Sequence, residues 1–157
     1  MEMDPELASF LSSPVMIIIG TSDEQGRPEI GRAVGAAMEC SAGAANLVVS
    51  AWQWPQTIRN LRANGRVAVT FARPSDYLSF QIKGRAEVMP ADPDDIQRSE
   101  RYMADILTVL SGLGLDPRLA APWLTNRDAA RVRIDVDAVF VQTPGSKAGQ
   151  QVLGQHR

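Results

Sequence analysis

Short apolar segments rich in β-branched residues recur along this chain, and short connections join most of them. The clearest run is Val15–Ile19, and the segments 66–72 and 131–143 alternate apolar and polar residues. Alternation with a period of two is typical of strands that bury one face. A parallel neighbour would need a crossover of about a dozen residues or more, and few connections here are that long. The sequence therefore predicts an antiparallel sheet that closes into a barrel.

Six strands and four helices are expected from the complete pattern. The strands fall at 15–19, 29–39, 46–51, 66–72, 77–89 and 131–143, and the helices at 5–12, 55–64, 92–112 and 117–124. Asp92 is a typical N-cap because Pro93 follows it, and Gly65 suits the end of the short helix. In the last strand, Val136, Ala138 and Phe140 are expected to point inward. The tail 144–157 is predicted to be irregular, and no repeat or linker interrupts the single α+β domain expected over 1–157.

The second strand carries the most informative side chain. Arg32 is the one charged residue in a row that otherwise holds Ile30, Val34, Ala36 and Met38. The opposite row contains only glycine and alanine between residues 31 and 37, so a bulky group can approach the backbone there. A guanidinium in an apolar row needs solvent or a partner, and phosphate is a partner that it binds through two parallel hydrogen bonds.

Composition excludes several classes of function. A net charge of −2 and a pI of 5.4 argue against nucleic acid as the main partner, because phosphate neutralisation needs a basic face. The one histidine, His156, is next to the C-terminus, which disfavours a histidine-activated nucleophile and a zinc site. With one cysteine, no apolar run of membrane length and no signal-like start, we expect a cytoplasmic protein that contacts no membrane. If it is an enzyme, a cofactor is expected to carry the chemistry.

Several motifs, in order and spacing, resemble the pyridoxamine 5′-phosphate oxidase-like proteins of the FMN-binding split-barrel family. The matching segments are Phe10–Pro14, Ile17–Thr21, Gly26–Pro28, Thr57–Val69, Gln81–Ala86 and Phe140–Gly145. The resemblance covers roughly Leu7 to Gly149. It implies a six-stranded antiparallel split β-barrel with peripheral helices, usually a homodimer with two flavin sites at the subunit interface.

The resemblance also implies where FMN would bind. Its phosphate would contact a basic residue on the second strand and polar groups before the short helix, and the fifth strand would face the isoalloxazine ring. Carried over by position, the cofactor-binding candidates are Arg32, Ser50, Trp52, Gln56, Thr57, Gln81 and Lys83. Flavin-binding relatives often have a lysine just before the short helix, whereas residues 52–57 contain no cation here.

Each candidate also has an interpretation that involves no ligand. Arg32 suits a barrel rim with its stem buried, and Trp52 with Trp54 suits a dimer interface. The hydroxyls of Ser50 and Thr57 suit capping, and the Gln81–Lys83 face suits solvent. Trp123, beyond the long helix, is expected to lie farther from a flavin than Trp52.

Three functions are therefore compared. The leading hypothesis is an FMN-dependent oxidoreductase that acts on an unidentified small molecule, with no catalytic residue assigned. The second is a non-catalytic protein that binds or senses a flavin or haem. The third is a deazaflavin-dependent reductase on the same barrel, and the missing cation at 52–57 favours unusual cofactor binding.

Overall fold

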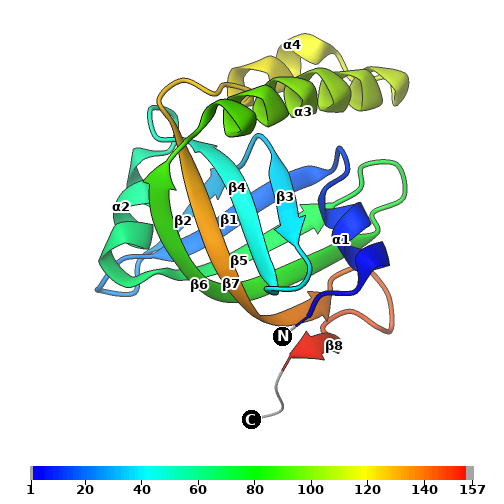
Figure 1. Ribbon diagram of the computed structural model, residues 1–157. Coiled ribbons are helices and arrows are strands. Elements are labelled where there is room, and N and C mark those ends of the chain that lie inside the picture. Colours follow the sequence, from blue (N-terminus) through cyan, green and yellow to red (C-terminus); the bar gives the residue numbers. More distant parts are fainter. Residues whose placement is uncertain (1, 155–157) are drawn as a thin grey trace.

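The structure is a computed structural model that describes residues 2–154, and in that range eight strands form one antiparallel sheet (Figure 1). The sheet curls into a barrel. Its strands are β1 (Met16–Ser22), β2 (Pro28–Arg32), β3 (Ala36–Glu39), β4 (Ala44–Ser50), β5 (Arg66–Ala72), β6 (Ser79–Pro90), β7 (Ala129–Val141) and β8 (Gln151–Gly154). They follow the order β2-β1-β5-β6-β7-β4-β3, and β8 pairs with β7. The split-barrel expectation is confirmed, with eight strands in place of six.

The expected single strand 29–39 is wrong, because the chain bends between β2 and β3. Val34 N–H donates to Val48 O at 2.8 Å, and Val48 N–H donates to Gly35 O at 3.0 Å, so two residues oppose one. This arrangement is a β-bulge, which bends a strand. The bend lets β2 pair with β1 while β3 pairs with β4, and the barrel closes.

Alternate residues of the strands fill the barrel with aliphatic and aromatic side chains. Ile17, Ile19, Val69, Phe71 and Ile82 are fully buried on one side of the core. On the other side β4 is buried on both faces, because α3 covers it from outside. A continuous core of this kind supplies most of the free energy of folding.

Two helices cover the barrel, and their ends follow the sequence signals. α2 (Pro55–Asn64) ends at Gly65, which has a φ of 68°, and packs against β1 and β2. α3 (Pro93–Gly112) begins with a capping box between Asp92 and Asp95 and crosses the upper end of the barrel in Figure 1. Both caps were predicted.

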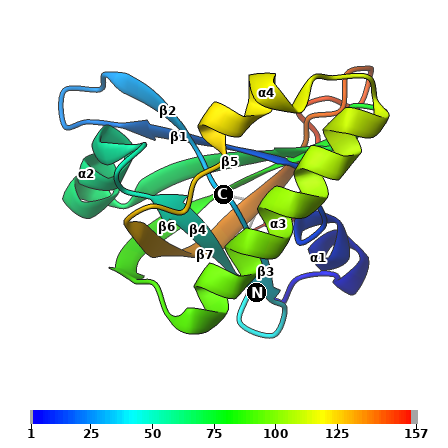
Figure 2. The same ribbon diagram turned by 90° about the horizontal axis from the view of Figure 1, so that it is seen from above.

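Three shorter helices complete the described chain. They are α1 (Pro5–Leu11), α4 (Pro117–Ala120) and the 3₁₀ turn η1 (Ala121–Trp123). Figure 2, from above, shows α4 beside the outer surface of β1 and β2. None of the helices in residues 2–154 is long and apolar enough to cross a membrane.

A second bulge changes which side chains of β7 point inward. Lys83 pairs with Ala138 and Gly84 with Val136, which leaves Asp137 unpaired. The inward row therefore continues from Val136 to Val139, and the expected inward positions Ala138 and Phe140 are wrong. The irregular tail is also wrong in part, because β8 forms within it; His156 lies outside the described residues.

We predict that Gly84→Ala destabilises the protein by at least about 2 kcal/mol, because core overpacking of this kind costs about 1–3 kcal/mol or more. A Cβ at Gly84 would lie 2.0 Å from the backbone oxygen of Asp135, whereas one at Gly112 would meet nothing within 4 Å. The free energy of unfolding of Gly112→Ala should therefore stay within about 1 kcal/mol of the wild-type value. Urea denaturation measures both free energies of unfolding. Equal stability of the two variants would contradict the close approach.

Candidate functional site

The outer face of the sheet aligns several sequence candidates in one row. Arg32 pairs with Ile18, Ile18 with Thr70, and Thr70 with Gln81. Side chains at directly opposed positions share a face, so this row runs from β2 to β6. Three strand spacings of about 4.8 Å put its ends about 14 Å apart. Gln81 Nε2 donates to Thr70 Oγ1 at 3.1 Å.

The adjacent row brings Lys83 onto the same face. It pairs Lys83 with Ala68, Ala68 with Gly20, and Gly20 with Ile30. Ile30 is 57% exposed, and Lys83 is exposed with its Nζ 5.2 Å from the Phe140 ring centre. Two small residues between a cation and an exposed isoleucine leave a shallow floor on the surface.

Arg32 is held by an aromatic ring instead of a carboxylate. Its guanidinium carbon lies 4.5 Å from the ring centre of Trp123. Among residues 2–154 it has no ion-pair partner, and its buried Nη1 donates no hydrogen bond. Arg32 also borders a small internal cavity that Tyr102 lines. Burial raises the pKa of Tyr102, although the charge of Arg32 opposes the shift, and its hydroxyl donates to Val15 O at 2.6 Å.

A second arginine repeats this arrangement near the start of α2. The guanidinium carbon of Arg127 lies 4.4 Å from the ring centre of Trp52, which is 52% exposed. No carboxylate within the described range pairs with Arg127. The Ser50 hydroxyl donates to Arg127 O at 2.6 Å and accepts from Gln53 N–H at 3.1 Å. Ser50 therefore fixes the backbone that carries Arg127.

The segment 121–128 connects the two stacks. Trp123 is at its start and Arg127 near its end, and Ala51 N–H donates to Asp128 O at 2.9 Å. Figure 2 shows this segment passing from η1 toward β7 beside the beginning of α2. One stretch of chain thus serves both arginine–tryptophan stacks.

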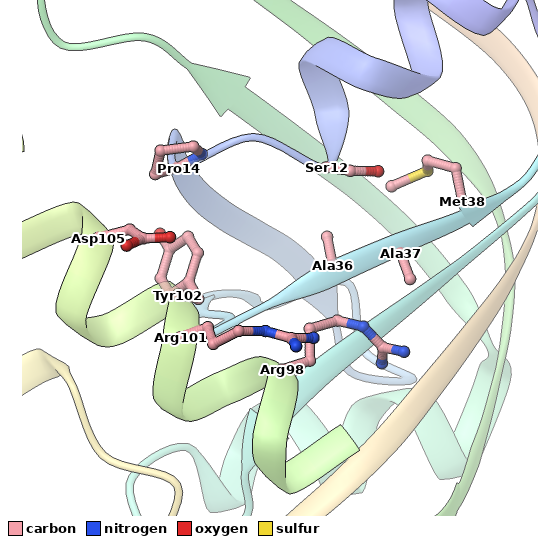
Figure 3. Close-up of a pocket in the computed structure, with 9 residues that line it drawn as sticks. All are labelled: Ser12, Pro14, Ala36, Ala37, Met38, Arg98, Arg101, Tyr102 and Asp105. Atoms are coloured by element: carbon pink, nitrogen blue, oxygen red, sulfur yellow. The ribbon is translucent and has the colours of Figure 1, made fainter. Parts of the chain in front are cut away.

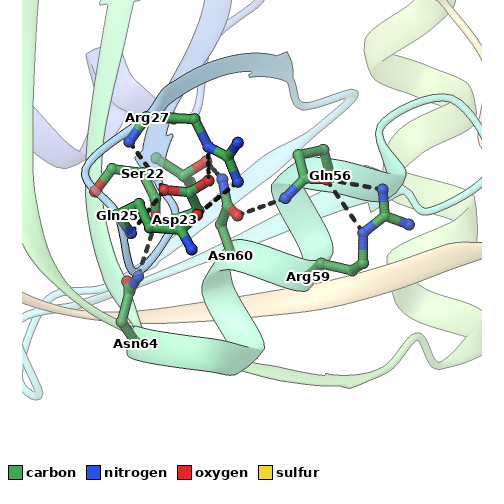
Figure 4. A network of polar contacts seen from close by, with 9 residues as sticks. Ser22, Asp23, Gln25, Arg27, Gln56, Arg59, Asn60 and Asn64 are labelled. Atoms are coloured by element: carbon green, nitrogen blue, oxygen red, sulfur yellow. Dashed lines mark hydrogen bonds and ion pairs between the residues drawn. The ribbon is translucent and has the colours of Figure 1, made fainter.

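Two further candidates, Thr57 and Gln56, lie in the first turn of α2, one buried and the other in a polar network. Thr57 is fully buried against Gly31, and its Oγ1 has no hydrogen-bond partner in the part of the chain that the structure describes. Gln56 Nε2 donates to Asn60 Oδ1 at 2.7 Å, and its Oε1 accepts from Arg59. Figure 4 shows this polar network along α2 and the β1–β2 turn. The structure therefore places Thr57 on the core side of β2, and Arg32 on the outer side.

An apolar groove of about 710 Å³ adjoins Arg32 on the outer face. It lies between β1, the 73–77 turn and the segment from α3 to α4. Its rim carries exposed apolar side chains, among them Tyr77, Leu113, Leu115, Leu119 and Trp123. A smaller, polar cleft of about 370 Å³ lies between α3 and β3 (Figure 3).

In the 73–77 turn, Arg73 and Asp76 form an ion pair with each other. Arg73 Nη2 lies 2.6 Å from Asp76 Oδ2, and this hydrogen bond holds the pKa of Asp76 down at about 2. Tyr77 has a φ of 63°, an uncommon value for a bulky residue. Arg73 is thus occupied by a carboxylate, whereas Arg32 is not.

Sequence reasoning missed two residues of this region. Trp123, expected to lie farther from a flavin than Trp52, stacks on Arg32. Arg127 was not considered, and it supplies a cation beside the stretch 52–57 that has none of its own. No local pattern marks either residue, because each partner lies far away in the sequence.

The comparison with protein families identifies the fold. The family model described as pyridoxamine 5′-phosphate oxidase matches residues 3–142. The chain belongs to this family. No curated protein matches the chain significantly. The residues described contain no group of three or more His, Cys, Asp or Glu side chains that could hold a metal ion.

Solved structures share the fold of this family member at low sequence identity. HupZ of Group A Streptococcus is 17% identical, with a TM-score of 0.58, over 94% of this chain and 100% of that chain. An F420 reductase is 18% identical, with a TM-score of 0.51, over 83% of this chain and 93% of that chain. HutZ, the heme storage protein from Vibrio cholerae, is 17% identical, with a TM-score of 0.54, over 98% of both chains.

We predict that Thr57→Val stabilises the ligand-free protein by about 1 kcal/mol, because an unpaired buried hydroxyl costs about 1–3 kcal/mol. Thr21→Val is the matched control, since Thr21 Oγ1 accepts from Asn60 Nδ2 at 3.0 Å. Thr21→Val should lower the free energy of unfolding by about 1–2 kcal/mol, because the side-chain amide of Asn60 then has no acceptor. Thermal unfolding of both variants checks the difference. A destabilised Thr57→Val would show that the hydroxyl has a partner.

Proposed function

We propose that this protein binds FMN on the outer face of its barrel and acts as an oxidoreductase on a small molecule. The supporting observation is the pair of arginine–tryptophan stacks, Arg32 on Trp123 and Arg127 on Trp52. An arginine without a carboxylate partner keeps its donors for an anion, and a partly exposed indole offers a face to an aromatic ring. FMN combines a phosphate with a flat aromatic ring, so it matches both features.

Arg32 is the proposed principal contact of the phosphate. Arg127 adds positive charge beside the start of α2, where residues 52–57 have no cation. The N-cap of α2, Trp54, makes no side-chain cap, and the first turn contains no acidic residue. Free N–H groups and the helix dipole both favour an anion at such an end. Ser50 acts through Arg127, by holding its backbone.

Gln81 and Lys83 are the proposed neighbours of the ring. Both lie on the outer face, and Gly20 and Ala68 leave the adjoining surface low enough for a flat ligand. When bound, FMN supplies hydride and electron transfer. The chain supplies a hydrogen-bonding amide from Gln81 and a positive charge from Lys83.

The apolar groove next to Arg32 is the proposed place for the small-molecule substrate. Its volume of about 710 Å³ lies within the range of about 300–1,000 Å³ that is common for ligand sites. Most of its lining is apolar, and leucine is the commonest residue in it. We therefore propose a substrate with a substantial apolar part.

We predict that Arg32→Ala and Arg127→Ala each weaken FMN binding by about 1.5–3 kcal/mol, the range for a hydrogen bond to a charged group. The affinity of both variants for riboflavin, which lacks the phosphate, should stay close to that of the wild type. Titration of ligand-free protein, followed by tryptophan fluorescence and calorimetry, gives the FMN-to-riboflavin affinity ratio. Binding of FMN should quench the emission of Trp52 and Trp123.

The matched control is Arg62→Ala, which removes an exposed cation from the far part of α2. Its affinity ratio should equal that of the wild type. Arg32→Lys should recover only part of the loss, because an ammonium cannot form the two-pronged contact. An unchanged ratio in Arg32→Ala would reduce this residue to a structural role at the barrel rim.

Identification of the bound ligand separates FMN from the alternatives. Mass spectrometry of the ligand released from purified protein should give the mass of FMN, with a flavin absorbance band in the intact protein. Release of a deazaflavin would support the reductase alternative, and release of haem would support a binding or sensing protein. The F420 reductase and the heme storage protein among the similar structures motivate these two comparisons.

We further propose that the protein is a homodimer. Ile30, Tyr77 and Leu119 are 57%, 69% and 67% exposed on or beside the outer face, and a stable interface buries more than about 1,000 Å². Light scattering should give twice the 17.0 kDa of one chain at micromolar concentration. Ile30→Asp should shift the protein toward the monomer, whereas a wild-type monomer would rule the assembly out.

A further inference from the structure

The polar cleft between α3 and β3 is separate from the proposed flavin surface. Its volume is about 370 Å³. Figure 3 shows that α3 contributes one wall, β3 another, and the link from α1 to β1 the third. The buried ring of Tyr102 stands between this cleft and the small cavity at Arg32.

Charges of both signs project into this cleft from α3. Arg101 and Asp105 lie one helical turn apart and are exposed, and neither has an ion-pair partner among residues 2–154. Arg98 donates from Nη1 to the buried Asp95 at 3.0 Å, and Asp95 also accepts from Arg131. In Figure 3 the two guanidinium groups extend toward β3, while the Asp105 carboxylate lies on the side of Pro14.

The β3 wall offers backbone hydrogen-bonding groups. β3 ends the strand order of the sheet and, among residues 2–154, pairs with β4 alone, so every second residue turns its N–H and C=O outward. On β4, Val48 exchanges backbone hydrogen bonds with Val34 and Gly35, so Asn46, two residues earlier, also directs its N–H and C=O toward β3. Its partner Ala37 therefore faces β4, and Ala36 and Met38, on either side of Ala37, face away from β4. Their backbone groups therefore face the cleft.

We propose that this cleft binds a dipeptide-sized zwitterion, that is, a short peptide with free termini. Arg101 and Arg98 contact its carboxylate, Asp105 contacts its ammonium group, and its peptide group pairs with the edge of β3. Peptide ligands are commonly bound by strand addition and by capture of a charged terminus. A phosphate would use only the arginines, and an apolar ligand would use none of these groups.

Calorimetric titration of the full chain with the dipeptide Ala-Ala tests the proposal directly. N-acetyl-Ala-Ala lacks the ammonium group, and Ala-Ala-amide lacks the carboxylate. Each should bind about tenfold more weakly or worse than Ala-Ala, because each loses a hydrogen bond between charged groups. Inorganic phosphate should not displace Ala-Ala at equal concentration.

Two variants assign the contacts. Asp105→Asn should remove the preference for Ala-Ala over its N-acetyl form, and Arg101→Gln should remove the preference over the amide. Glu100→Gln, an exposed position of α3 that does not line the cleft, should keep both preferences.

Absence of Ala-Ala binding at millimolar concentration would overturn the proposal, as would equal affinity for the three peptides. Displacement by phosphate would reassign the arginines to a simple anion site. None of these results depends on FMN, so this proposal and the proposed function fail separately.

Discussion

Three backbone hydrogen bonds of residues 33–35 close the barrel. Ala33 N–H donates to Ile17 O, and Val34 and Gly35 both bond to Val48, so the bent chain joins β1 to β4. The bend also decides where the neighbouring residues lie. Before it, Arg32 points to the outer face over β1; after it, Ala36 begins an edge strand beside α3. Both candidate sites therefore depend on one bulge.

Aromatic stacking, rather than ion pairing, orients the two cations of the proposed flavin surface. A guanidinium over an indole gains electrostatic attraction while keeping its hydrogen-bond donors. An ion pair would occupy those donors, as Asp76 does for Arg73. The segment that carries Trp123 and Arg127 is in turn fixed by hydrogen bonds from the Ser50 hydroxyl to Arg127 O and from Ala51 N–H to Asp128 O. Correct placement of the cations thus relies on residues that themselves contact no ligand in our proposal.

Sequence patterns predicted those parts of the structure that local chemistry determines. The N-cap at Asp92, the end of α2 at Gly65 and the inward row of β5 all follow from neighbouring residues. The bulge opposite Val48 and the bulge at Asp137 depend on a partner strand, so residue alternation could not reveal them. The Arg127–Trp52 stack was invisible for the same reason. The sequence suggested Arg32 because a charge interrupted an apolar row, but its partner Trp123 came only from the fold.

α3 is hydrogen-bonded to the barrel at its first turn and its middle, but not at its C-terminal end among the described residues. Its first turn is tied to β7 through Asp95 and Arg131, and Tyr102 ties its middle to Val15. Beyond Gly112, the hydrogen bonds that the described residues 113–120 make stay within residues 109–124. This end of α3 and the turn after it therefore make no hydrogen bond to the barrel among the described residues, and their exposed leucines form one side of the groove. The leucine side of the groove is therefore attached to the barrel through apolar packing and the Arg32–Trp123 stack, so the proposed substrate would meet the part of α3 that makes no hydrogen bond to a strand among the described residues.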